Sequence, residues 1–182
     1  MEIVSIFDDC LYSFKTSEGD ELSDFLKRIS DVEWLMNFFQ DNIEDLQSGF
    51  YGSITCDEAT RLTLEEAKLF RKKLVTIKAL KESNKDTGLD VLFKPLVDTE
   101  TRNKGLQKSK AKGSKHKNWL RIYAIKLEDG SYIITGGTLK LTQSMNTKDH
   151  TLKELRKLEL CRDFLKSKDI IDHDSFVEFL NE

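Results

Sequence analysis

The chain has 182 residues, of which 38% are hydrophobic and 34% charged, and its formal net charge is −3. This length and composition exclude an intrinsically disordered protein, because the apolar residues suffice to bury a core. They predict one globular domain with or without an appendage.

The charges are segregated along the chain. Residues 1–60 hold 14 acidic residues against 3 basic ones. Residues 101–126, which we call the basic segment, hold nine basic residues and no acid: Arg102, Lys104, Lys108, Lys110, Lys112, Lys115, Lys117, Arg121 and Lys126. Such a segment predicts a surface that meets a phosphate-rich partner, with a solvated flexible loop as the alternative.

Several classes of protein are disfavoured by what the sequence lacks. No apolar run approaches the length of a membrane span, and the acidic N-terminus has no signal-peptide pattern. Cys10, Cys56 and Cys161 form no CxxC pair, and the three histidines have no ligand spacing. We therefore expect a cytoplasmic protein with reduced thiols, no metal, no cofactor and no membrane partner. Walker, GxGxxG and GxSxG motifs are also missing.

The N-terminal part reads as two strands followed by helices. Short apolar runs at 3–7 and 10–14 predict a strand pair or one bent strand. The first helix presents an apolar face from Leu22 to Ile29. A capping box of Ser30 and Glu33 predicts a second helix that ends before Gly49. A third helix is expected to begin near Thr63.

The middle of the chain predicts strands. Residues 89–96 form a strand candidate, and the polar tract 98–117 suits a mobile loop or a frayed hairpin. Residues 118–127 alternate in the manner of a strand, and an Asp-Gly turn leads to a partner strand over 131–135. Gly136-Gly137 is expected to end this hairpin, allowing a bulge or a close backbone approach.

The C-terminal part is helical again. Thr151 and Glu154 form a further capping box, and Asp174 or Ser175 is a candidate cap for a last short helix. The predicted fold class is α+β, with helices packed on a small antiparallel sheet. The predicted organisation is an acidic extension over 1–60 and an α+β core over 61–182.

Arg121 is the sharpest candidate for a functional residue, because a strand would hold it in a fixed position. The alternation places it on one face with Trp119 and Tyr123. Aromatic rings beside a cation can stack a base while the guanidinium holds the phosphate. The alternative is a surface residue that pairs with an acid on the neighbouring strand.

The hairpin resembles that of the RelE/HigB toxin superfamily. The resemblance is centred on 119–140: the strand Trp119–Ile125 with Arg121 inside it, an acidic turn, the strand Tyr132–Gly137, and then Lys140. It implies an α+β fold and an endoribonuclease that cleaves mRNA at the ribosome without metal. It also implies a neutralising antitoxin, here expected to carry a helix-turn-helix domain.

The resemblance further implies roles for individual residues. Attack of a 2′-hydroxyl on the adjacent phosphate needs a base, stabilising cations and an acid for the leaving oxygen. Arg121 and Lys140 would stabilise the phosphate, and His116 would act as acid or base, with His150 as a second candidate. The RNA-binding set would comprise Lys108, Lys110, Lys112, Lys115, Lys117, Trp119 and Tyr123.

Two departures from the superfamily pattern keep other functions open. The acidic residues 1–60 have no counterpart in the simple toxins, and Lys140 stands in a segment where an arginine is expected. One alternative is a non-catalytic module that binds RNA, a ribosome or a protein through the basic segment. Another is that the acidic helices mask the basic segment or mimic nucleic acid.

Overall fold

A computed structural model describes residues 1–7, 10–97, 105–113, 118–142, 148–170 and 172–181. Its strands are β1 (Ile3–Phe7), β2 (Leu11–Phe14), β3 (Phe93–Pro95), β4 (Gln107–Lys112), β5 (Leu120–Lys126) and β6 (Tyr132–Leu139). Its helices are α1 (Glu21–Arg28), α2 (Val32–Asp41), α3 (Ile43–Leu46), α4 (Cys56–Glu82), α5 (Leu89–Leu92), α6 (Asp149–Ser167) and α7 (His173–Asn181).

The strands form one six-stranded sheet in the order β1-β2-β6-β5-β4-β3. The pairing of β2 with β6 is parallel, and the other pairings are antiparallel. The sheet is therefore mixed but mostly antiparallel, and the predicted α+β class is confirmed. The first two strands come from the predicted acidic extension, and β2 lies directly beside the central strand β6.

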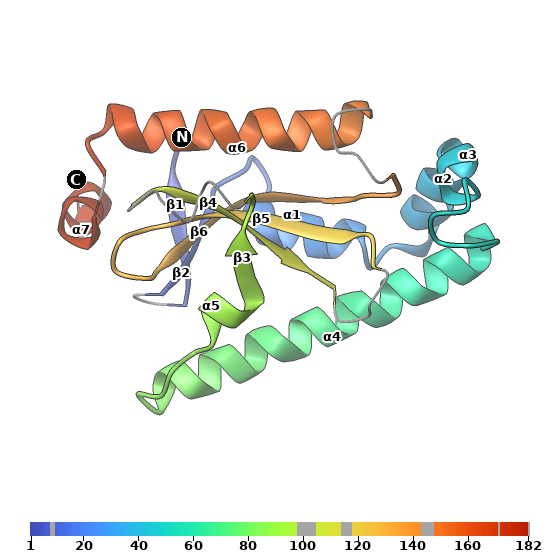
Figure 1. Ribbon diagram of the computed structural model, residues 1–182. Coiled ribbons are helices and arrows are strands. Elements are labelled where there is room, and N and C mark those ends of the chain that lie inside the picture. Colours follow the sequence, from blue (N-terminus) through green and yellow to red (C-terminus); the bar gives the residue numbers. More distant parts are fainter. Residues whose placement is uncertain (8–9, 98–104, 114–117, 143–147, 171, 182) are drawn as a thin grey trace.

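Helices cover both faces of the sheet (Figure 1). On one face, α1, α2 and α4 pack against Ile122, Ala124 and Ile134 in the larger buried cluster. On the other face, α6 and α7 pack against Tyr123, Ile125 and Ile133. Both faces of the central strands are thus buried, which explains why β5 and β6 read as nearly continuous apolar runs.

The two glycines of β6 do not end the strand, so the predicted end is wrong. The predicted bulge is confirmed, because the pairing of β5 with β6 shifts register between Tyr123 and Ala124, opposite Gly136. The strand continues to Leu139, and the helices on both faces approach its backbone. A Cβ at Gly136 would lie 2.2 Å from Oε2 of Glu154 on α6. A Cβ at Gly137 would lie 2.4 Å from Cδ1 of Phe25 on α1. Glycine here permits close packing of two helices on one strand.

The polar tract also differs in part from its prediction. Residues 107–112 form β4, an inner strand between β5 and β3, where a mobile loop or a frayed hairpin was expected. Small side chains make this possible, because Ser109 and Ala111 are buried on one face of β4. Lys108, Lys110 and Lys112 alternate with them and lie on the opposite face. Residues 98–104 and 114–117 lie outside the described part of the chain.

Three predicted helix starts are corrected by the structure. The side chain of Asp31, not that of Ser30, caps α2 by accepting from the Trp34 N–H at 3.0 Å. Helix α4 begins seven residues before Thr63, with Thr55 as its cap. Helix α6 begins at Asp149, before the predicted cap Thr151. In the described residues no helix is both long and apolar enough to cross a membrane.

Candidate functional site: a cation cluster at one end of the sheet

Three basic side chains gather where β5 begins and β6 ends. Lys112 of β4 pairs with Arg121 of β5, and Arg121 pairs with Thr138 of β6, two residues before Lys140. Lys112 is exposed, and the other two cations are half-buried. We call Lys112, Arg121 and Lys140 the cation cluster.

The three cations are close enough to affect one another electrostatically. Burial lowers the pKa of Lys140 below its usual range, and the positive charges of Arg121 and Lys112 lower it further. Like charges held together in this way favour an anion between them, since an anion relieves their mutual repulsion. The cluster is therefore a candidate site for a phosphate group.

Arg121 is held in place by main-chain carbonyl groups. Its Nη1 donates to the carbonyl oxygens of Asn118 at 2.7 Å and of Leu120 at 2.6 Å. Burial lowers its pKa, yet a guanidinium stays protonated at any physiological pH. Among the described residues no carboxylate forms an ion pair with it. The alternative prediction was that Arg121 pairs with an acid on the neighbouring strand. It is wrong, because the cross-strand neighbours of Arg121 are Lys112 and Thr138.

Tyr51 is a component of the site that sequence reasoning missed. It lies in the segment between α3 and α4, and its hydroxyl donates to the carbonyl oxygen of Lys140 at 2.6 Å. Its ring packs edge-on against Trp119, with centroids 5.0 Å apart. Burial raises the pKa of Tyr51, and the nearby charge of Arg121 opposes that rise. The sequence signal was the aromatic pair Phe50-Tyr51 between two glycines, Gly49 and Gly52.

Trp119 and Tyr123, expected to stack bases, are core residues, which corrects their predicted role. Trp119 is 4% exposed and Tyr123 is 0% exposed, so neither ring offers a free face to a base. The indole Nε1 of Trp119 donates to Oγ1 of Thr63 at 2.8 Å. The ring of Tyr123 is covered by α6, and burial raises its pKa.

The predicted lysines of the basic segment fall into separate groups. Lys108 forms an ion pair with Glu159 on α6, and its side chain is only 15% exposed. Lys110 donates to the carbonyl oxygen of Leu96 at 2.6 Å. Lys112 alone of these three joins the cation cluster. Lys115, His116 and Lys117 lie outside the described residues, so their predicted roles stay predictions.

His150 lies at the same end of the sheet but is engaged in packing. Its Nε2 is 3.1 Å from the carbonyl oxygen of Leu139, and its ring meets Phe38 edge-on with centroids 5.3 Å apart. Burial lowers the pKa of His150, which favours the neutral ring. Within the described ranges, no group of three or more histidine, cysteine or acidic side chains is placed to hold a metal ion.

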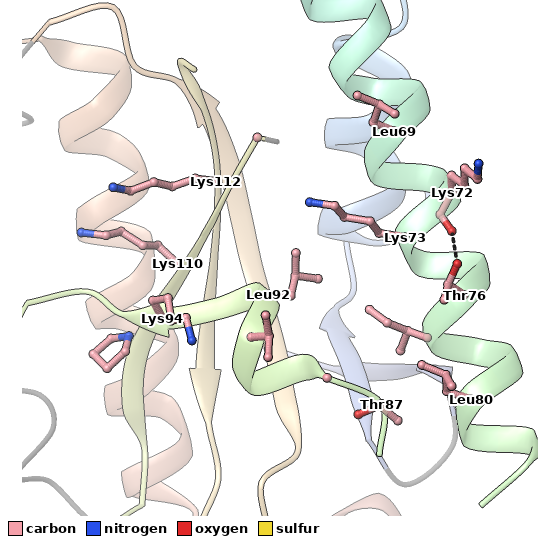
Figure 2. Close-up of a pocket in the computed structure, with 15 residues that line it drawn as sticks. Leu69, Lys72, Lys73, Thr76, Leu80, Thr87, Leu92, Lys94, Lys110 and Lys112 are labelled. Carbon is pink, nitrogen blue, oxygen red and sulfur yellow. Dashed lines mark hydrogen bonds between the residues drawn. The ribbon is translucent and has the colours of Figure 1, made fainter. Parts of the chain in front are cut away.

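A cavity of about 750 Å³ lies between α4 and the strands β3 and β4. Its walls are mostly apolar, with Leu69, Ile77 and Leu92 among them, and none of its described lining residues is acidic. Figure 2 shows Lys73 extending from α4 toward β4, whereas Lys110 and Lys112 point away from α4. The cavity is thus open to an apolar group, and Lys110 and Lys112 are among the residues that line it.

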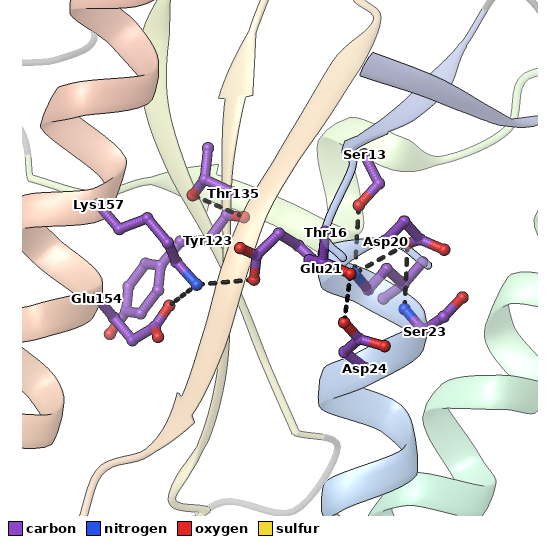
Figure 3. A network of polar contacts seen from close by, with 11 residues as sticks. Ser13, Thr16, Asp20, Glu21, Ser23, Asp24, Tyr123, Thr135, Glu154 and Lys157 are labelled. Carbon is purple, nitrogen blue, oxygen red and sulfur yellow. Dashed lines mark hydrogen bonds and ion pairs between the residues drawn. The ribbon is translucent and has the colours of Figure 1, made fainter. Parts of the chain in front are cut away.

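A buried polar network holds α6 and α1 on the sheet (Figure 3). Nζ of Lys157 lies 2.7 Å from Oε2 of Glu21 and 3.1 Å from Oε2 of Glu154. Burial raises the pKa of Glu154 above its usual range, and Lys157 opposes the rise. All three side chains are at least two-thirds covered, so this network stabilises packing rather than meeting a large ligand.

Comparisons with known proteins assign no family to this chain. No family model, no curated protein and no solved structure matches the chain. The resemblance to the RelE/HigB superfamily therefore stays a prediction, and the function rests on the residues themselves.

Proposed function

We propose that this protein binds RNA by its phosphate backbone, with the phosphate at the cation cluster. The observation that carries the proposal is the cross-strand alignment of Lys112 and Arg121 beside Lys140. An arginine fork can grip a phosphate with two hydrogen bonds, and lysines add point charges. Lys112 and Arg121 lie on strands, and Lys140 directly follows β6. The sheet therefore positions these cations more firmly than a long loop would, which suits a phosphate held at one place.

We further propose that the bound RNA is cleaved, as a toxin of the RelE/HigB type would do, with mRNA at the ribosome as substrate. A base takes the proton of the 2′-hydroxyl as its oxygen attacks the adjacent phosphorus, the bond from phosphorus to the 5′-oxygen breaks, and the 5′-oxygen takes up a proton from an acid. The products are a 2′,3′-cyclic phosphate and a 5′-hydroxyl. Arg121 and Lys140 would stabilise the charge that develops on the phosphate, and His116 keeps its proposed role in proton transfer.

A second candidate is phosphate binding without cleavage. The observation that favours it is the chemistry around the cluster: the described neighbours are a half-buried tyrosine and main-chain carbonyl groups. His150 instead faces Phe38 and the Leu139 carbonyl. Under this alternative the protein would hold RNA or a ribosome, and its affinity would still fall steeply with salt.

The test uses the purified full chain with end-labelled RNA, with and without ribosomes. We expect the wild type to bind and cut, and Arg121→Gln and Lys140→Gln to lose both activities. Arg156→Gln is the matched control, because Arg156 is an exposed arginine on α6 away from the cluster. Binding that depends on Arg121 without any cleavage selects the second candidate. Binding that is absent, or equal in all four proteins, overturns both.

A cellular experiment addresses the toxin assignment. Induced expression of the wild type should arrest growth, and Arg121→Gln should relieve the arrest. We propose as partner an antitoxin with a helix-turn-helix domain, encoded in the adjacent reading frame. Co-expression of that neighbour should restore growth. Normal growth with the wild type alone contradicts the toxin assignment.

A further inference from the structure

An exposed aromatic ring lies next to Tyr51, which hydrogen-bonds to the main chain of Lys140 in the cation cluster. Phe50 is 41% exposed and belongs to neither buried cluster of the described residues. Its ring meets that of Tyr51 edge-on, with centroids 4.8 Å apart and planes 89° apart. A single exposed apolar side chain is common on protein surfaces. What distinguishes Phe50 is that its ring packs on Tyr51, whose hydroxyl donates to the main chain of Lys140 in the cation cluster.

Tyr51 connects this ring to the cluster. Its hydroxyl donates to the Lys140 carbonyl oxygen at 2.6 Å, its ring rests on the buried Trp119, and the charge of Arg121 acts on its hydroxyl. Figure 1 shows the segment between α3 and α4 at the end of the sheet where β5 begins and β6 ends. Phe50 is therefore anchored, through its neighbour, at the rim of the cation cluster.

We propose that Phe50 stacks on a base of single-stranded RNA whose backbone phosphate lies at the cation cluster. The inference rests on the proposed function and names its substrate class. A duplex keeps its bases stacked inside, whereas an unpaired nucleotide can place its base on an aromatic ring. The subsite accepts any base, because every base has a face for stacking and Phe50 has no hydrogen-bonding group with which to read its edge.

Phe50, one of the first 60 residues, thus takes the base-stacking role that the sequence had predicted for Trp119 and Tyr123. The ring of Tyr51 packs edge-on against that of Trp119, and the ring of Phe50 packs edge-on against that of Tyr51. This places the stacking ring on the part of the chain that the simple toxins lack. The proposed substrate is an unpaired stretch of RNA, and a paired stretch is excluded.

The experiment compares two ligands that share phosphates but differ in bases. The probes are a 12-nucleotide single-stranded RNA and an inorganic polyphosphate of similar charge. The proteins are the wild type, Phe50→Leu, Phe50→Trp and Arg121→Gln. Leu160→Ala is the control for the loss of an exposed apolar side chain elsewhere, since Leu160 is 60% exposed on α6. Circular dichroism melting checks that each variant folds.

We expect Phe50→Leu to weaken RNA binding about tenfold, in line with the stacking of one base, and to leave polyphosphate binding unchanged. Phe50→Trp should bind RNA at least as well as the wild type. A 2-aminopurine base in the RNA should be quenched by the wild type and not by Phe50→Leu. Duplex RNA should show no dependence on Phe50.

The two possible failures are distinguishable. If Phe50→Leu binds RNA as the wild type does while Arg121→Gln binds weakly, the stacking inference is overturned and the phosphate site stands. An equal loss of RNA and polyphosphate binding in Phe50→Leu also overturns it, because the ring would then only support the cations. If Arg121→Gln changes neither ligand, the proposed function itself fails.

Discussion

Gly137 of β6 lies so close to Phe25 of α1 that a Cβ at position 137 would be 2.4 Å from the ring atom Cδ1. Phe25 is 1% exposed, and the core around it leaves the ring no space into which to move. We expect Gly137→Ala to destabilise the fold by about 1–3 kcal/mol, the usual cost of overpacking a core. Urea denaturation at equilibrium measures this.

Gly19→Ala is the matched control for Gly137→Ala. A Cβ at Gly19 would meet nothing closer than Oδ1 of Asp24 at 3.7 Å, which is an ordinary contact. That variant should unfold at nearly the wild-type urea concentration. A Gly137→Ala protein as stable as Gly19→Ala would show that α1 can move away from the sheet at little cost.

The local sequence predicted the hairpin of β5 and β6 well and its end badly. Alternation and the Asp129-Gly130 turn are local signals, and the strands form as expected. The Gly136-Gly137 pair was interpreted as an end that allows a bulge or a close approach. The sequence could not show that the strand continues to Leu139 or that two helices make the close approach. Thr63 was expected to cap a helix for the same reason: its hydroxyl donates to the Ala59 carbonyl oxygen within α4 and accepts from Trp119, which lies 56 residues away.

The candidate site shows the same division between local and long-range information. Arg121 was predicted from its place in an alternating strand, and the structure places it in the cation cluster. The exposure of Trp119 and Tyr123 was misjudged, because alternation predicts an open face only where one side of a sheet is free. Helices cover both sides here. Tyr51 could not be linked to Lys140 without the fold, since 89 residues separate them.

The salt dependence of RNA binding should separate Lys112 from Lys108. Lys112 is exposed in the cation cluster, whereas Lys108 is already neutralised by Glu159. Each phosphate contact on a single strand adds about 0.7 to the slope of log affinity against log salt. We therefore expect Lys112→Gln to reduce that slope by about 0.7 and Lys108→Gln to leave it nearly unchanged. Titrations between about 50 and 200 mM salt measure both slopes.

Equal slopes in the two variants would contradict this assignment of charges. The comparison is internally matched, because both lysines lie on β4 and on the same face of that strand. A loss of slope in Lys108→Gln alone would place the phosphate nearer to α6 than to the end of the sheet.

The buried hydrogen bond between Trp119 and Thr63 should contribute measurably to stability. Thr63→Val removes the acceptor of the indole N–H and leaves that donor buried without a partner. We expect a loss of about 1–3 kcal/mol in the free energy of unfolding. In a Trp119→Phe background the same change should cost less, because no donor remains to be satisfied.

Thr76→Val is the control for Thr63→Val on the same helix. Thr76 is exposed, and its hydroxyl donates to the Lys72 carbonyl oxygen within α4. Its replacement should change stability little, because water can serve the freed carbonyl group. If Thr63→Val costs the same in both backgrounds, the loss comes from the threonine alone and the hydrogen bond contributes nothing.

The buried Glu154 should make stability depend on pH in a direction that the structure fixes. Burial raises the pKa of Glu154 in the folded state, Glu21 raises it further, and the cations Lys157 and Arg28 oppose the rise. The protonated form is therefore favoured by folding. Its contribution to stability is fully present below the ordinary pKa and is lost as pH rises through the raised value.

Glu154→Gln removes this titration, because glutamine is neutral throughout. We expect the melting temperature of the variant, relative to the wild type, to increase as pH rises from about 4 to 8. Glu178→Gln on α7 is the control, since Glu178 is exposed and its replacement should give a constant offset. The difference in melting temperature between Glu154→Gln and the wild type could also prove constant with pH. The ion pair with Lys157 would then fully compensate the burial of the carboxylate. In that case the network in Figure 3 would give stability no pH dependence.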